Sequence, residues 1–219
     1  MGHPGELKQA RSIATRDALI AAALDLIYED GYDAATTHAI SQRAQVSRGA
    51  LLYHFPNKND IIIAAMDRSM SEATDLIRGE ARRVAARDSN IEEFVDFVWR
   101  MFTKRFFYLA MEHITESRTN PELRERLLPR VRQFHEALDA VWVELYRDAP
   151  ISARHAQVVL NMTVCLIRGM GVQTVYRGDA DYFDSMLRLW KSVLRGLVEG
   201  DLDAFIARAG LPISLRSSP

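Results

Sequence analysis

The chain has very little cysteine and no long uncharged hydrophobic run. Cys165 is the only cysteine among 219 residues, which excludes an intrachain disulfide framework and suits a reducing cytoplasm. Its apolar neighbours Val164, Leu166 and Ile167 predict a buried, unreactive thiol. No segment approaches the roughly 20 apolar residues that cross a bilayer, and residues 1–14 lack the apolar core of a secretory signal. We therefore expect a soluble, cytoplasmic protein without a membrane partner.

An excess of charge of one sign is also missing, because the net charge is −1. This near neutrality argues against a protein that coats polyanions indiscriminately. The chain lacks a Gly-x-Ser-x-Gly elbow, a phosphate-binding Gly loop, a cysteine cluster and a convincing catalytic acid pair. The best metal-site candidate is Glu112, His113 and Glu116, which share a helix face but lack the His-Glu-x-x-His order. We therefore expect no enzymatic activity, no metal and no cofactor.

The residues that are present predict helices. Hydrophobic residues make up 48% of the chain, which supplies a large core, and they recur at helical spacing without β-type alternation. Thr15 is predicted to cap the first helix after a polar arm over residues 1–12, and Gly31 to end it. A long amphipathic helix is predicted from Lys58 into the 80s, followed by a polar break at residues 87–90. We therefore expect an all-α fold.

The segment from Thr36 to Asn59 is the part of the chain whose residue order indicates a specific chemistry. It contains Arg43, Arg48 and Lys58 but no Asp or Glu. Two short apolar-periodic stretches, 37–44 and 47–55, meet at a tight joint, which is typical of a helix-turn-helix. A second helix packed in this way exposes one face that fits the major groove of DNA.

The residue types on that face suit DNA recognition. The guanidinium of Arg48 can reach guanine O6 and N7 together, and Gly49 and Ala50 leave no bulk between the backbone and the bases. Thr37 occupies the expected N-cap of the first helix, where its hydroxyl and the free amides can take a phosphate. Donors at the far end of the second helix suit the flanking phosphates. The candidate DNA-contacting residues are Thr37, Arg43, Ser47, Arg48, Gly49, Ala50, Tyr53, His54 and Lys58.

The order of features from about Ile13 to Ser69 identifies a family. A first helix is followed by Glu29-Asp30-Gly31-Tyr32, a Thr-rich entry, Val46-Ser47-Arg48-Gly49, His54-Phe55-Pro56 and Lys58. This run resembles the DNA-binding domain of the TetR family of transcriptional regulators. The family often has an aromatic pair before the His, whereas this chain has Leu52-Tyr53, which leaves Tyr53 for the phosphate contact. The resemblance implies a DNA-binding domain over 13–73, with the helix-turn-helix at 36–55, and a helical ligand-binding and dimerisation domain over 74–210.

Residues 91–117 are apolar around most of the helix circumference, which predicts one core helix buried on most faces. The resemblance implies a cavity in this domain for a small, largely apolar ligand, and aromatic and methionine side chains suit its lining. The candidate ligand-binding residues are Phe94, Val98, Met101, Phe102, Phe106, Met111, Phe134, Trp142 and Met162.

Two further helices, over about 152–176 and 180–198, each show an apolar stripe. Gly169 inside the first predicts close approach of another helix, because an interior Gly costs roughly 1 kcal/mol relative to Ala. The resemblance implies that both helices pair with a second copy in a four-helix interface. The candidate interface residues are Met170, Phe183, Met186, Leu187, Trp190 and Leu194. In the alternative, these stripes pack within a single chain.

The sequence therefore predicts a DNA-binding transcriptional regulator, a homodimeric repressor that a small apolar ligand releases from a palindromic operator. One alternative is a helix-turn-helix regulator controlled by a protein partner without a small-molecule ligand. A filled, polar-free core over residues 90–175 would favour that alternative, whereas an open cavity would favour a sensor. The less favoured alternative is a metal-dependent enzyme that uses Glu112, His113 and Glu116.

Overall fold

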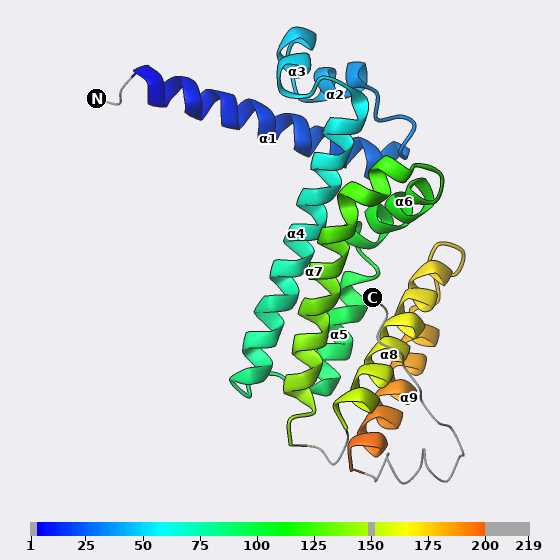
Figure 1. The fold of residues 1–219 in the computed structure, drawn as a ribbon. Helices are drawn as coiled ribbons and strands as arrows, with labels where there is room; N and C mark the ends of the chain where they lie inside the picture. Colours follow the sequence, from blue (N-terminus) through cyan, green and yellow to red (C-terminus); the bar gives the residue numbers. More distant parts are fainter. Residues whose placement is uncertain (1–3, 149–151, 200–219) are drawn as a thin grey trace. The chain divides into compact units, whose positions relative to one another are not determined.

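The computed structural model describes residues 4–148 and 152–199, in which all the regular secondary structure is helical. The predicted all-α fold is confirmed for this part of the chain (Figure 1). The helices are α1 (Pro4–Asp30), α2 (Thr37–Arg43), α3 (Arg48–His54), α4 (Lys58–Ala85), α5 (Ile91–Met101), α6 (Arg105–Thr119), α7 (Pro121–Leu145), α8 (Ala153–Gln173) and α9 (Ala180–Glu199).

The chain divides into two compact units, and α4 and α7 each contribute to both. The first unit comprises Met1–Asp75 and Lys104–Phe134. In it α1 packs against α2, α3 and α6, and Ile40, Leu51 and Phe55 are buried in the common core, as the sequence predicts. Burying these three side chains stabilises the helix-turn-helix by roughly 1.5–3 kcal/mol each.

The second unit comprises Leu76–Thr103 and His135–Pro219. In it α5 packs against α8 and α9, and Phe94, Trp142 and Leu194 are buried. The ring centroids of Phe94 and Trp142 lie 5.8 Å apart, a favourable aromatic contact. The domain boundary expected at residues 73 and 74 falls inside the continuous helix α4 and stays a prediction, and residues 200–210 of the expected second domain lie outside the described residues.

Side-chain caps fix several helix starts. The backbone N–H of Asp60 donates to Asn57 Oδ1 (3.0 Å) before α4, and the N–H of Leu123 donates to Asn120 Oδ1 (3.1 Å) before α7. Thr15, in contrast, lies inside α1, where its hydroxyl donates to the carbonyl of Arg11 (2.9 Å). The expected start of the first helix is therefore wrong, because residues with good helix propensity continue the helix back to Pro4.

The single helix predicted over residues 91–117 is also wrong, because the chain forms α5 and α6 there. Helix α5 ends where Phe102 leaves helical geometry (φ −89°, ψ 13°), and Lys104 is extended before α6 begins. The break falls at the polar residues Thr103, Lys104 and Arg105. It contains no Gly or Pro, the residues that most often mark the end of a helix. Two helices with different buried faces explain why the aromatic residues of this segment did not fit one stripe.

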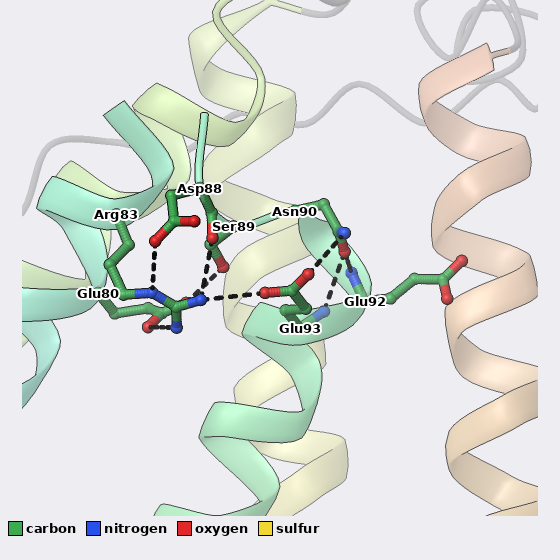
Figure 2. Close-up of polar contacts among 7 residues, drawn as sticks. All are labelled: Glu80, Arg83, Asp88, Ser89, Asn90, Glu92 and Glu93. Carbon is green, nitrogen blue, oxygen red and sulfur yellow. Dashed lines mark hydrogen bonds and ion pairs between the residues drawn. The ribbon is translucent and has the colours of Figure 1, made fainter. Parts of the chain in front are cut away.

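The corner between α4 and α5 is held by a polar network around Arg83 (Figure 2). The Arg83 guanidinium donates to the carboxylates of Glu80 (3.0 Å) and Glu93 (3.2 Å) and to the carbonyl of Asp88 (2.9 Å). Glu80 is buried and also accepts the Ser89 hydroxyl (2.5 Å). Because a buried carboxylate is costly unless it is paired, these bonds fix the course of the corner.

Candidate nucleic-acid interface

The two short helices α2 and α3 are joined through a turn with one left-handed residue. Gln45 has φ 55°, a conformation that costs a non-glycine residue about 1–2 kcal/mol. The N–H of Val46 donates to the carbonyl of Ser41 (3.0 Å) across this joint, and the Val46 side chain packs against the buried core. The predicted joint at Gln45–Val46 is confirmed.

Hydroxyl caps define the first residue of each short helix. Thr36 Oγ1 accepts the N–H of Ala39 (3.1 Å), so Thr36 is the N-cap of α2, and Ser47 Oγ accepts the N–H of Ala50 (3.2 Å) at the start of α3. The expectation that Thr37 is the cap is therefore wrong by one residue, because Thr37 already has helical geometry. Contacts of Thr37 and Ser47 with DNA stay predictions.

Most of the surface of α3 around buried Leu51 is open to solvent. Arg48 and Gly49 are exposed, Ala50 is half-buried, and Tyr53 keeps 81% of its surface exposed. The rings of Tyr53 and His54 form an edge contact with centroids 5.2 Å apart. Among the described residues, Arg48 forms no ion pair with a carboxylate, so its guanidinium is available at this surface.

Arg43 and Lys58 are positioned by neighbouring side chains. Arg43 Nη1 pairs with Glu29 Oε2 at 2.6 Å, and this hydrogen bond raises the pKa of Arg43. Lys58 Nζ donates to the carbonyl of Tyr32 (3.2 Å) and lies 4.6 Å from the centroid of its ring. Glu29 and Tyr32 thus position these cations, a role that the sequence pattern did not reveal, although both lie in the turn Glu29-Asp30-Gly31-Tyr32.

Glu112, His113 and Glu116 do not converge on a metal site. Glu112 Oε2 accepts the N–H of Tyr32 (3.3 Å), whereas His113 is buried, and burial lowers the pKa of its imidazole. Within residues 4–148 and 152–199, no three His, Cys, Asp or Glu side chains are grouped to hold a metal ion.

The nine candidate ligand-binding residues are divided between the two units. Phe106, Met111 and Phe134 belong to the first unit and the other six to the second. Met111 and Met162 are exposed, so these two side chains do not line a buried cavity. The remaining seven stay candidates.

Two buried donors in the second unit have no partner. Trp142 and Tyr146 are 1% and 5% exposed, and their ring centroids lie 4.6 Å apart. Neither Trp142 Nε1 nor the Tyr146 hydroxyl has a hydrogen-bond partner among the described residues. Burial raises the pKa of Tyr146, so the hydroxyl stays protonated. Unpaired buried donors are costly and indicate a site where an acceptor would be stabilised.

The candidate dimer residues face the interior of their own unit. Met170, Phe183, Leu187 and Leu194 are buried within one chain, and Trp190 Nε1 donates to Thr163 Oγ1 (3.1 Å) on α8. Of the six candidates, Met186 and Trp190 are partly exposed, and Met186 has no hydrogen bond that ties it to α8. In this conformation the stripe packs within the chain, which is the alternative weighed from the sequence.

A second apolar row lies on the outside of α8 and α9, and we call it the outer stripe. Its members are Met162, Cys165, Gly169 and Val172 on α8 and Tyr182, Leu189 and Val193 on α9. Cys165 is exposed, so the predicted buried thiol is wrong. A Cβ added at Gly169 would meet nothing within 4 Å, so no helix of the described chain approaches it closely. Alternating spacings of three and four residues could have revealed this stripe in the sequence.

No helix in the described part of the chain is long and apolar enough to span a membrane.

Comparison with known proteins agrees with this architecture. The family model described as "Bacterial regulatory proteins, tetR family" matches residues 19–65, which include all of α2 and α3. The HTH-type transcriptional regulator CymR of Pseudomonas putida is 25% identical over 174 residues, covering 80% of this chain and 86% of CymR.

Two solved structures share the fold along most of the chain. A protein assigned as a transcriptional regulator from Saccharomonospora viridis, in complex with choline, has a TM-score of 0.66 and 19% identity, covering 82% of this chain and 95% of its own. A protein assigned to the TetR family from Mesorhizobium loti has a TM-score of 0.66 and 16% identity, covering 90% and 97%. The relatives and the fold are those of DNA-binding regulators and not of enzymes. The chain is therefore a helix-turn-helix transcriptional regulator of the TetR family.

Proposed function

We propose that the protein is a homodimeric repressor that binds a palindromic operator in the cytoplasm and leaves it when a small, largely apolar molecule binds. The observation that carries the DNA-binding part is the open face of α3. Arg48 and Tyr53 are exposed on it, whereas Leu51 of the same helix is buried. A rigidly packed helix of this kind presents its first turn to base edges.

Different residues contact the bases and the phosphates. Arg48 in the first turn reads guanine, and Gly49 and Ala50 allow the backbone to approach the bases. Tyr53 and Lys58 contact phosphates and set the register on the duplex. Because Tyr32 already orients the Lys58 ammonium, little side-chain freedom is lost when this phosphate contact forms.

The outer stripe supports a dimer. Two helices of one chain that each expose an apolar row are typical of half of a four-helix interface with two-fold symmetry. The open space at Gly169 allows a partner helix to approach closely. In such a dimer the two copies of α3 lie in successive major grooves, about 34–36 Å apart.

The second unit supports control by a small molecule. Its core is not polar-free, because Thr163 is fully buried, and Trp142 and Tyr146 bury donors that find no partner among the residues that the structure describes. The similar structure from S. viridis was solved in complex with choline, so a protein of this fold binds a small organic molecule. A ligand that binds the conformation with unsuitable spacing of α3 shifts the population away from DNA.

Selection of bound duplexes from a random pool by the purified full-length protein tests this function. We expect enrichment of a palindrome whose half-sites are about one helical turn apart. Arg48→Ala should relax the preference at one position of each half-site, whereas Arg132→Ala, an exposed arginine on α7, should select the wild-type palindrome. Failure of the wild-type protein to enrich any sequence at moderate salt would contradict operator binding.

A further inference from the structure

A groove of about 230 Å³ lies between α7 and α8 in the second unit. Its apolar surface comes from Leu138, Leu160 and Val164. The polar residues that line it are His135, Asp139, Gln157, Asn161, Cys165 and Arg168. The volume is below the roughly 300–1,000 Å³ of drug-sized pockets, so the groove suits a smaller molecule.

The acidic residue of the groove is already engaged. Asp139 Oδ2 accepts a hydrogen bond from Gln157 Nε2 (3.2 Å). Gln157 and Arg168 lie three turns apart on α8, which separates them by about 16 Å along the helix axis. Asp139 and Arg168 therefore mark opposite ends of the groove, and the ends differ in charge.

Arg168 is a partly desolvated cation without an anionic partner. Its Cζ atom lies 4.9 Å from the ring centroid of buried Phe102, and burial lowers the pKa of its guanidinium. It forms no ion pair with any carboxylate in the part of the chain that the structure describes. A guanidinium removed from water gains most from an anion that binds two of its N–H groups.

His135 also lines the groove, one helical turn before Asp139 on α7. Burial lowers the pKa of its imidazole, the Arg168 charge lowers it further, and Asp139 acts in the opposite direction. A neutral imidazole beside Arg168 adds a polar group without a second full positive charge. One guanidinium, with Asp139 at the far end, favours a monoanion over a dianion.

We propose that this groove binds a small organic acid, whose carboxylate pairs with Arg168 and whose apolar body lies on Leu138, Leu160 and Val164. The site stands on its own geometry, and only the naming of this acid as the effector rests on the proposed function. Because Cys165 belongs both to the groove and to the outer stripe, an acid bound here contacts a helix that would carry the dimer interface. Through α8, binding of the acid can therefore change how the two chains pair and how far apart the two copies of α3 lie.

Thermal unfolding of the full-length protein with paired acids and amides tests the site. The probes are acetate, hexanoate and benzoate, each compared with its neutral amide and with equimolar sodium chloride. We expect hexanoate or benzoate near saturation to raise Tm by about 2–4 °C, and the matching amide to raise it by less than half as much. Arg168→Gln should abolish the difference, and Arg82→Gln, which neutralises an exposed arginine of α4, should preserve it.

The comparison of acid with amide uses the wild-type protein, so it does not depend on the folding of Arg168→Gln. If no acid raises Tm more than its amide, or if Arg168→Gln keeps the wild-type difference, the groove is not an acid site. A protein that selects its palindrome but ignores all three acids would overturn this site alone. A protein that binds the acids but selects no DNA would overturn the proposed function and leave the site standing.

Discussion

Leu189→Lys should separate the dimer without unfolding the chain. Leu189 lies on the outer stripe of α9 and keeps 68% of its surface exposed in the single chain. Its replacement by lysine therefore removes little packing within the protomer, and surface changes of this kind alter stability by about 0.5 kcal/mol or less. At a two-fold interface the same change appears twice and places two charges in an apolar contact.

The size of the effect follows from the area that remains to be buried. Full burial of a leucine side chain contributes about 1.5–3 kcal/mol, so two-thirds of it leaves roughly 1–2 kcal/mol per copy. Two copies give about 2–4 kcal/mol. Since 1.4 kcal/mol corresponds to a factor of ten, the dimer dissociation constant should rise by about 30- to 700-fold, before any added cost of burying the lysine charge.

Sedimentation velocity over a concentration series measures this constant directly. Leu76→Lys is the matched control, because Leu76 is 61% exposed on α4 and outside the outer stripe. We expect the control to dimerise as the wild type does, and both variants to keep the wild-type circular dichroism spectrum. Dimerisation of Leu189→Lys at wild-type strength would refute the assignment of the outer stripe, and equal dissociation of both variants would show that the effect is not local.

Four further substitutions test the DNA contacts and two buried polar side chains. Arg48→Ala should cost about 1–3 kcal/mol of operator binding, measured by titration of the selected duplex, and an unchanged affinity would show that α3 does not read bases through this residue. Lys58→Ala should weaken all sequences about equally and reduce the slope of log K against log salt by about one; a slope equal to that of the wild type would exclude the phosphate contact. Tyr146→Phe should raise the free energy of unfolding in urea by about 1 kcal/mol, because it removes a buried hydroxyl without a partner, and a decrease would show that the hydroxyl is bonded. Burial lowers the pKa of His113, so the stability it permits is present above about pH 6.5 and is lost below, where the unfolded chain takes up the proton first; His113→Leu should lose less Tm between about pH 7.5 and 5.5, and an identical loss would contradict this role.

The helix-turn-helix was predictable because its signals are local. Ile40, Val46 and Leu51 recur at the spacing of two short helices, and both are bounded by hydroxyl residues that cap them. The cap predicted from the sequence was Thr37 and not Thr36, because the two threonines are adjacent and only the backbone geometry distinguishes the cap from the first helical residue.

The rest of the chain was less predictable because its helices are apolar on more than one face. Helix α5 ends at Met101 without a Gly or Pro beside it. On α8 and α9 the inner and outer rows are both apolar, so composition alone favoured the row with larger side chains, such as Phe183 and Trp190. Phe183 is buried and Trp190 is partly buried in the unit, whereas Met162, Tyr182 and Leu189 of the outer stripe stay exposed.

The exposure of Cys165 makes the chain a ready-made spectroscopic reporter. It is the only thiol in the sequence and it lies at the surface of α8, so one maleimide or nitroxide label attaches per copy without any engineered residue. A pair of labels in a symmetric dimer gives a single distance by pulsed electron resonance. That distance would show directly whether two copies of α8 meet, and whether they move apart when DNA is released.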